Sequence, residues 1–177
     1  KNVLSHHECK QFLAATETMG FLPDEPLQGS NSILAHNFVW LVDDSILDVI
    51  YQRCLPHLPP SLHDGGVCGL NARWRIYRYV PGAVYRPHID GAWPASGLDE
   101  DGNYLYDAKG DRWSRLTFLL YLNEGFNGGC TTYFTPGKDE GILDGWPVAP
   151  KAGCVMIFHH GSTEGSLLHE GSGVLKG

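Results

Sequence analysis

The sequence predicts an α+β fold in which an antiparallel β-sandwich or jelly roll is braced by helices near the N-terminus. Two observations support this fold class. Apolar residues at helical spacing occur in two segments before residue 55, and the later part of the chain consists of short apolar and aromatic segments separated by glycine and proline. Helices followed by a run of strands are typical of α+β proteins. A length of 177 residues predicts a single domain over residues 1–177.

The first helix is predicted over residues 6–19. Ser5 and Glu8 have the spacing of a capping box, in which each side chain bonds the backbone of the other residue. Gly20 is a suitable stop signal. The apolar stripe of this helix consists of Cys9, Phe12 and Leu13.

A second helix is predicted to begin at Asp43, Asp44 or Ser45, since each of these side chains can cap a helix. Pro56 ends it, because proline cannot continue a helix. Between the helices only a short strand is expected, near residues 33–41. The apolar face of the second helix consists of Ile46, Leu47, Ile50, Tyr51 and Cys54.

The remaining predicted elements are strands, bounded by turn residues such as the Pro81–Gly82 pair. The segment 116–122 is apolar at every position except Thr117 and Tyr121, which predicts a strand covered on both faces, with the helices on one of them. The predicted strands span residues 73–80, 83–89, 116–122, 131–134, 155–158 and 166–169.

Composition and charge exclude several classes of partner. The net charge of -7 argues against a general nucleic-acid binder, which needs a basic face. No apolar run approaches the roughly 20 residues that cross a bilayer, so no membrane partner is expected. The five cysteines are odd in number and scattered, which favours reduced thiols. Together with the absence of a signal-peptide pattern at the start, this predicts a cytoplasmic or nuclear protein.

The strongest chemical signal is a split trio of metal-type ligands. His88 and Asp90 are two residues apart, so on a strand they share one face and can chelate one ion. His169 is far away in sequence and would supply a third direction. Two histidines and a carboxylate form the facial triad of non-haem Fe(II) oxygenases. The alternative is chance, because a H-x-D triplet is short and the chain has nine histidines.

Other histidines compete with this trio but have no carboxylate at strand spacing. His159 and His160 directly follow the predicted strand 155–158 and precede a glycine, so they are expected at the surface.

The residues around the trio resemble a known family. The stretch from Tyr79 to Asp90 matches the pattern Y-x-x-G-x-x-Y-x-x-H-x-D and resembles the signature of prolyl 4-hydroxylase-like 2-oxoglutarate/Fe(II)-dependent dioxygenases. Further segments resemble the core strands of this family in the same order, so that the resemblance covers residues 70–177. These segments are 115–123, 128–134, 150–158 and 169–177.

The resemblance implies a double-stranded β-helix, a jelly-roll or cupin-like fold. It implies Fe(II) held by His88, Asp90 and His169, with 2-oxoglutarate as cosubstrate, dioxygen as the other reactant and ascorbate as an additional cofactor. Tyr79, Thr117 and Tyr121 are the residues expected to contact the cosubstrate. The resemblance thus implies that the catalytic residues, which are also the metal ligands, are His88, Asp90 and His169. It implies that the residues that bind the cosubstrate are Tyr79, Thr117 and Tyr121.

The function implied by the resemblance is hydroxylation of a C–H bond, first of all in a prolyl residue of a protein or peptide. Two alternatives stay open, since a fold does not determine a substrate. One is a small-molecule oxygenase on the same scaffold, and the other is a non-catalytic binding module.

The chain departs from the family pattern in two places. Cys130 stands where relatives often have glutamate, and it is interpreted as a buried packing thiol. The basic residue that pairs with the distal carboxylate of 2-oxoglutarate is expected at the second position after Gly177. Lys176 precedes that glycine, and its side chain would point the wrong way. The natural protein is therefore expected to continue beyond residue 177.

A long acidic segment, residues 91–114, directly follows the first two ligands. It can be interpreted as a solvated loop with a turn at residues 101–103, or as a lid near the metal. The aromatic residues that would form the contact surface of a lid are Trp93, Tyr104, Tyr106 and Trp113.

Overall fold

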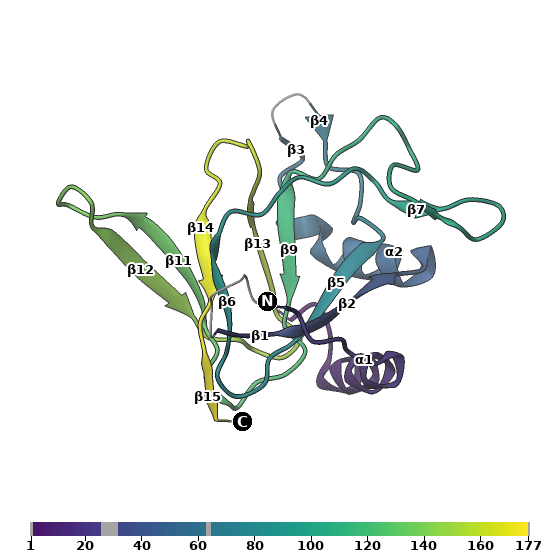
Figure 1. Cartoon of the computed structure of the whole chain (residues 1–177). Helices are drawn as coiled ribbons and strands as arrows, with labels where there is room; N and C mark the ends of the chain where they lie inside the picture. Colours follow the sequence, from purple (N-terminus) through teal and green to yellow (C-terminus); the bar gives the residue numbers. More distant parts are fainter. Residues whose placement is uncertain (1, 26–31, 63–64, 177) are drawn as a thin grey trace.

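The computed structural model describes residues 2–25, 32–62 and 65–176, and it is a mixed α+β protein, as the sequence predicts (Figure 1). Over these residues the chain forms two α-helices, both in the N-terminal part, and many short strands in several small sheets. Neither α-helix within the described ranges is long and apolar enough to cross a lipid bilayer.

The first helix, α1 (His6–Met19), begins as its capping box predicts. The Ser5 hydroxyl accepts a hydrogen bond from the Glu8 backbone N–H at 3.2 Å, and the Glu8 carboxylate accepts from the Ser5 N–H at 2.8 Å. At the other end, the Gly20 N–H donates to the Thr16 carbonyl and closes the last turn. The predicted bounds of this helix are confirmed.

The second helix, α2 (Asp44–Cys54), is capped by Asp43, which accepts from the Ser45 N–H at 2.9 Å. The short 3₁₀-helix η1 (Leu55–His57), which contains Pro56, follows directly. These bounds confirm the prediction, and the buried residues of α2 belong to its predicted apolar face. They are Leu47, Ile50 and Cys54.

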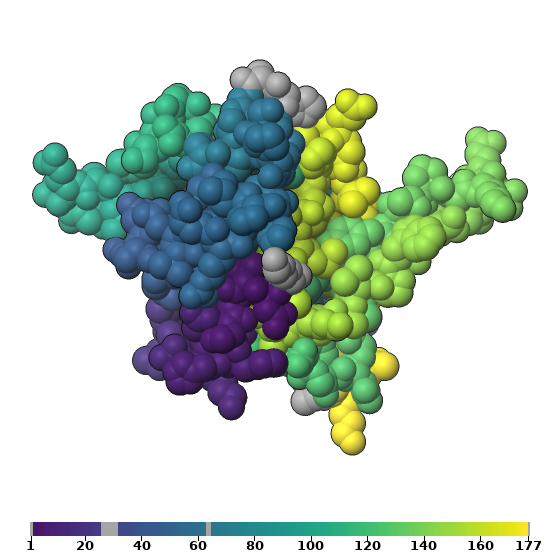
Figure 2. Space-filling model, turned by 180° about the vertical axis from the view of Figure 1, so that it is seen from behind, coloured from purple at the N-terminus to yellow at the C-terminus, as the bar shows by residue number. Residues whose placement is uncertain are grey.

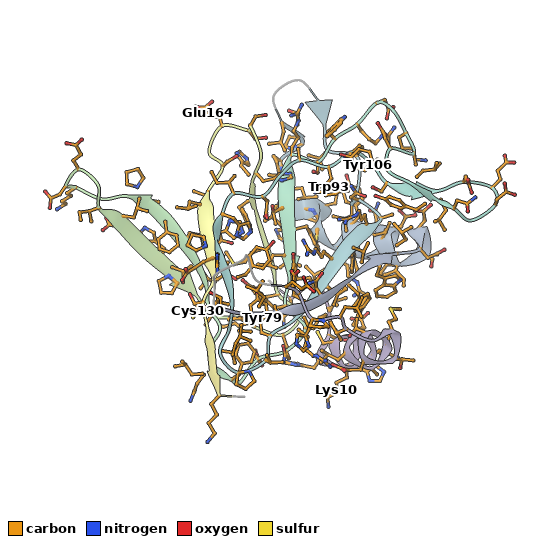
Figure 3. All side chains as sticks on the ribbon, viewed as in Figure 1. Lys10, Tyr79, Trp93, Tyr106, Cys130 and Glu164 are labelled. Carbon is orange, nitrogen blue, oxygen red and sulfur yellow. The ribbon has the colours of Figure 1, made fainter. Side chains whose placement is uncertain are left out.

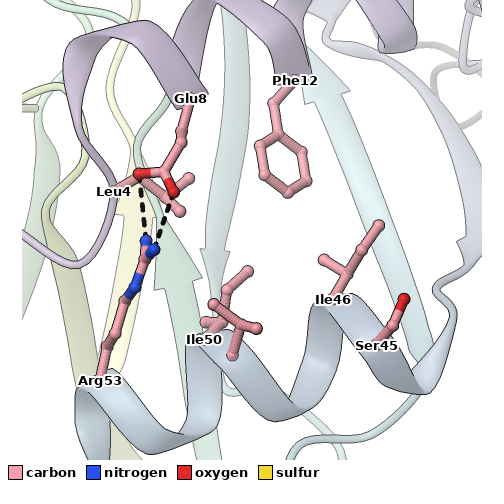
Figure 4. Close-up of a pocket in the computed structure, with 8 residues that line it drawn as sticks. Leu4, Glu8, Phe12, Ser45, Ile46, Ile50 and Arg53 are labelled. Atoms are coloured by element: carbon pink, nitrogen blue, oxygen red, sulfur yellow. Dashed lines mark hydrogen bonds and ion pairs between the residues drawn. The ribbon is translucent and has the colours of Figure 1, made fainter.

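The two helices meet over a small apolar groove that an ion pair crosses at one end (Figure 4). The Arg53 guanidinium contacts the Glu8 carboxylate at 2.8 Å, and hydrogen bonds from Arg53 and from Ser5 hold the pKa of Glu8 at about 2. The main apolar cluster joins both helices to the N-terminal residues and to Ala152, which lies just before β13 (Val155–His159). Its buried members are Val3, Leu4, Cys9, Ile50, Cys54 and Ala152.

The largest sheet brings the site residues into one row. Its strand order is β1-β6-β14-β11-β12, in which β1 and β6 are parallel and the other pairs antiparallel. The register places His88 opposite His169, and His169 opposite Tyr133. The bounds are β1 (Ile33–Leu34), β6 (Ala83–His88), β14 (Leu168–Gly171), β11 (Thr131–Pro136) and β12 (Leu143–Val148).

A second antiparallel pair, β9 (Leu116–Leu120) and β13 (Val155–His159), carries side chains toward that row. Every residue of β9 is partly buried. Phe118 and Leu120 pack against the helical cluster, whereas Thr117 contacts Asp90, so β9 is covered on both faces as predicted.

The other pairs are small. They are β2 (His36–Leu41) with β5 (Arg73–Arg78), β10 (Asn127–Gly128) with β15 (Val174–Lys176), β3 (Ser61–Leu62) with β4 (Gly65–Gly66), and β7 (Gly97–Leu98) with β8 (Tyr104–Leu105). From behind, the β11–β12 hairpin and the part of the chain that holds β7 and β8 project on opposite sides of the molecule (Figure 2).

Two predicted strands differ clearly from the observed ones, and one long observed strand was not predicted. The segment 33–41 is divided into β1 and β2, which pair with different strands. The strand predicted at 166–169 is instead β14, because Ser166 closes a turn onto the Thr163 carbonyl through both its N–H and its hydroxyl. The strand β12 was not predicted, since it contains Gly145 and Pro147 and is exposed along nearly its whole length.

All five cysteines lie in described residues and are free thiols, in agreement with the predicted reduced state. Cys130 is only partly buried, so its interpretation as a buried packing thiol is wrong.

Gly153 joins the N-terminal segment to the β-strands, and we expect Gly153→Ala to destabilise the fold. Its carbonyl accepts from the N–H groups of Val3 and Leu4, its φ is 78°, and an added Cβ would collide with the Leu4 carbonyl oxygen. The positive φ costs about 1–2 kcal/mol for alanine, and overpacking adds about 1–3 kcal/mol. Urea denaturation measures this loss of unfolding free energy.

Gly102→Ala is the matched control, because Gly102 has a φ of 81° with no neighbouring atom near the added Cβ. It should lose only the backbone cost. Equal losses for the two variants would contradict the role of the Leu4 contact.

Candidate metal centre

The predicted trio comes together at one end of the β6–β14 pair. His88 is the last residue of β6, Asp90 follows it, and His169 lies opposite His88 in β14. The ligand atoms all lie within 4.8 Å of one another. The Nε2 atoms of His88 and His169 are 3.1 and 3.6 Å from the Asp90 carboxylate oxygens. The three side chains together can hold a metal ion.

Both imidazoles are oriented by backbone carbonyls. The Nδ1 of His88 is 2.7 Å from the Arg86 carbonyl oxygen, and the Nδ1 of His169 is 3.1 Å from the Leu167 carbonyl oxygen. A carbonyl only accepts, so each Nδ1 must carry the proton and donate it. In the neutral form this leaves each Nε2 as a lone pair directed at Asp90, which is the tautomer that binds metals.

The charges at the site are already arranged for a cation. Burial alone would lower the pKa of His88, but its hydrogen bonds with Asp90 and Arg86 outweigh this and raise the pKa above the ordinary 6.5. Burial works to raise the pKa of Asp90, yet hydrogen bonds from His88 and Thr117 hold it below its ordinary value. Burial lowers the pKa of His169. The site therefore offers a carboxylate, a His169 imidazole that gives up its proton more readily than an ordinary histidine, and a His88 imidazole that holds its proton more tightly, so that a metal ion must replace this proton.

Thr117 fixes the position of the carboxylate. Its hydroxyl donates to Asp90 Oδ2 at 2.7 Å, and the Gly161 N–H donates to the Asp90 backbone carbonyl at 2.8 Å. Asp90 is thus held by β9 and by the turn after β13. Thr117 was predicted to contact the cosubstrate, and the structure places its hydroxyl on a metal ligand.

Aromatic side chains enclose His169, which is only 6% exposed. Phe158 meets its ring edge-on with 4.8 Å between centroids, and Tyr133 stacks on it at 5.8 Å with an interplanar angle of 29°. On the other side of the row, Tyr85 packs against His88 at 4.3 Å. These contacts restrict rotation of both imidazoles and exclude water from His169.

The other two predicted residues lie deeper in the interior. Tyr79 is partly buried and packs so tightly against Gly171 that a side chain there would collide with the tyrosine hydroxyl. The Tyr121 hydroxyl lies 2.7 Å from Thr131 Oγ1 and donates to Met156 Sδ at 3.2 Å. Burial raises the pKa of both tyrosines, so their hydroxyls stay protonated as donors. Figure 3 shows Tyr79 near the end of the sheets opposite to Trp93 and Tyr106.

Sequence reasoning missed Thr131, Tyr133 and Met156. Thr131 and Tyr133 follow the glycine pair at alternate positions of β11, both buried. This alternation is the signal that could have found them, since positions i and i+2 of a strand share a face.

The prediction that His160 lies at the surface is wrong, whereas His159 is partly buried. His159 belongs to β13, and its Nδ1 is 2.6 Å from the Glu164 carbonyl oxygen. His160 is 4% exposed, and within the described residues its ring makes no well-formed hydrogen bond. Its ring lies near the backbone of Gly91 and Ser114 and near Asp90, so His160 is a core residue behind the metal ligands.

The acidic segment 91–114 is an ordered loop with exposed aromatic side chains. Asp99 accepts from the N–H groups of Asp101 and Asn103, which confirms the predicted turn between β7 and β8. Trp93 packs against Tyr106 at 5.4 Å and carries the Arg73 guanidinium at 4.1 Å. All four aromatic residues of the predicted lid are more than a third exposed; its role as a lid stays a prediction.

A cleft of about 300 Å³ opens beside the trio and reaches His88. Its walls come from β1, β6 and the segment before β1, and they carry both acidic and basic groups. The lining residues are Asp24, Glu25, Leu34, Ala35, Tyr85, Arg86, Pro87 and His88.

Comparison with models of protein families, with curated proteins and with solved structures finds no match to this chain. The chemistry that the site can support therefore follows from its donor atoms and their surroundings.

Thr117→Val should weaken metal binding about 10–100-fold, because partners that orient a metal ligand typically contribute that much affinity. Valine keeps the shape of the side chain but removes the donor to Asp90. Thr132→Val is the matched control, since its hydroxyl bonds Ser172 and contacts none of the three ligands. Calorimetric titration with Co(II) measures both, and equal affinities would contradict the role of Thr117.

Metal binding should weaken as the pH falls. The proton on His88, whose pKa lies above 6.5, competes with the ion, whereas Asp90 stays ionised. Affinity should rise with pH through the pKa of His88 and then level off, with about one proton released per ion bound. Titration in buffers of different ionisation enthalpy, from about pH 5.5 to pH 8, measures both quantities. A constant affinity over this range would contradict the assignment.

Proposed function

We propose that this chain is an Fe(II)- and 2-oxoglutarate-dependent dioxygenase that hydroxylates a C–H bond. One observation carries the proposal: two imidazoles and one carboxylate converge from distant parts of the chain, and both imidazoles are held with Nε2 toward the carboxylate. Such a trio binds one face of an ion and leaves the other positions for a cosubstrate and dioxygen.

The residues present fit this cofactor. Imidazole and carboxylate ligands suit Fe(II), although affinity alone does not select iron among divalent metals. Bound Fe(II) would supply the oxidation chemistry, in which a C–H bond, dioxygen and 2-oxoglutarate give an alcohol, succinate and CO₂. The protein supplies position, a dry pocket and hydrogen bonds, as is general for cofactor enzymes.

The chain's own residues have separate tasks in this proposal. His88 and His169 give lone pairs, Asp90 gives charge, and Thr117 fixes the carboxylate. Phe158 and Tyr133 keep water from His169. A carboxylate at position 90 favours hydroxylation over halogenation, because a halogenase needs that position free for halide.

The finer fold in this proposal is a double-stranded β-helix. It is supported by the antiparallel pairs β6–β14 and β9–β13, which meet through the Thr117–Asp90 and Phe158–His169 contacts. The buried hydroxyls around Tyr121 are suited to a carboxylate of 2-oxoglutarate.

The proposed substrate is a prolyl residue in a protein or peptide, with the cleft beside His88 as its entrance. This choice follows the family resemblance. A free small molecule is the alternative substrate. Succinate release in the presence of peptides or of small molecules distinguishes the two classes.

The test is an anaerobic titration of the full-length protein with Fe(II) and then 2-oxoglutarate. We expect a weak visible charge-transfer band that Asp90→Ala abolishes, while Asp101→Ala, an exposed loop residue, leaves it unchanged. With oxygen, proline-containing peptides should gain the mass of one oxygen atom and succinate should be released. A wild-type protein that folds but gives no band would exclude the proposal.

A screen in which succinate release responds to small molecules but to no peptide would assign the alternative substrate class.

A further inference from the structure

Two tyrosine hydroxyls lie close to one sulfur atom, and a threonine hydroxyl lies within hydrogen-bond distance of one of these tyrosines. The Tyr121 hydroxyl is 3.2 Å and the Tyr133 hydroxyl 3.7 Å from Met156 Sδ, and Thr131 Oγ1 is 2.7 Å from the Tyr121 hydroxyl. Tyr121 directly follows β9, Thr131 and Tyr133 belong to β11, and Met156 belongs to β13. Thr131 and Tyr133 are both less than 9% exposed, so this is an interior polar cluster.

Tyr133 links this cluster to the metal ligands. Its backbone lies opposite His169 in the β11–β14 register, and its ring stacks on the His169 imidazole. Its hydroxyl lies beyond that stack, on the side of Met156. One side chain therefore contacts a metal ligand with its ring and the hydroxyl cluster with its oxygen.

The hydroxyl of Tyr133 has a poor partner. In the part of the chain that the structure describes, its hydrogen bond goes to a thioether, which is a weak acceptor. Buried hydroxyls in proteins are generally paired with stronger acceptors.

Two tyrosine donors directed at one weak acceptor fit a ligand that accepts from both. A carboxylate has about four acceptor positions and no donor, and its bonds to hydroxyls are charge-assisted. A carboxylate in the place of the Met156 thioether would accept stronger hydrogen bonds from the Tyr121 and Tyr133 hydroxyls than the sulfur does. The cluster lies next to the metal ligands, which is where a chelating cosubstrate must reach.

We propose that Tyr133 is a cosubstrate-binding residue, whose hydroxyl donates to a carboxylate of 2-oxoglutarate in place of Met156 Sδ while its ring supports His169. This inference rests on the proposed function and deepens it. The two roles of Tyr133 belong to different atoms, so substitutions can separate them.

The test measures two affinities by anaerobic calorimetry in the full-length protein: Fe(II) alone, and 2-oxoglutarate added to the Fe(II) protein. Tyr133→Phe keeps the ring and removes the donor, so it should weaken 2-oxoglutarate at least about tenfold and leave Fe(II) affinity unchanged. Tyr133→Leu removes the stack as well and should weaken Fe(II) too. Tyr77→Phe is the control, because it removes another tyrosine hydroxyl, whose hydrogen bond among the described residues goes to Tyr85.

Met156→Leu is a second, independent variant. If the sulfur only occupies the position of the cosubstrate carboxylate, then replacing it should leave 2-oxoglutarate affinity unchanged or improve it. A tenfold weakening in this variant would overturn the proposal, since Met156 would then be part of the binding contact itself.

The remaining outcomes are decisive as well. Unchanged 2-oxoglutarate affinity in Tyr133→Phe, beside a wild type that binds it, overturns this inference alone. Equal losses of Fe(II) and 2-oxoglutarate affinity in Tyr133→Phe also overturn it, because they indicate a purely structural role. A wild type that binds Fe(II) but no 2-oxoglutarate overturns the proposed function together with this inference.

Discussion

The antiparallel pairing of β6 with β14 is the constraint on which the site depends. It places His88 opposite His169, although the two are far apart in sequence, and the β11–β14 pairing adds Tyr133 to the same row. A slip of one residue in a strand turns every side chain to the other face. The register of three strands therefore decides both whether the metal ligands meet and whether the hydroxyl cluster lies beside them.

The electrostatics of the candidate metal centre follow from the short distances between Asp90 and the two histidines, His88 and His169. Asp90 is shared between two Nε2 atoms, each of which is held toward it by a carbonyl behind the ring. Partly buried charges of this kind are costly unless they are paired. The raised pKa of His88 favours its protonated form as a partner for Asp90, and a divalent cation can take the place of that proton. The same geometry thus stabilises the apo protein and selects for a cation.

Much of the fold could be predicted because its signals are local. The capping residues Ser5 and Asp43 determine where the helices start, and the i, i+2 spacing places His88 and Asp90 on one face. Linking His169 to them needed the family resemblance, since no local pattern connects residues on distant strands. His160 was misplaced for the same reason: its position after a strand suggests exposure, but the ends of the segment 91–114 pack over it.

What could not be predicted depends on how separate strands face each other. Tyr133 and Met156 are ordinary strand residues in sequence, and only the meeting of β11 with β13 turns them into partners. Strands and the residues directly after them carry the candidate metal ligands and the interior hydroxyls, whereas four exposed aromatic residues lie on the segment 91–114. Rigid elements hold reactive groups more accurately than loops do, and loops tolerate change in what they contact. Under the proposed function, this division keeps the chemistry of the site constant while the surface around it determines the substrate.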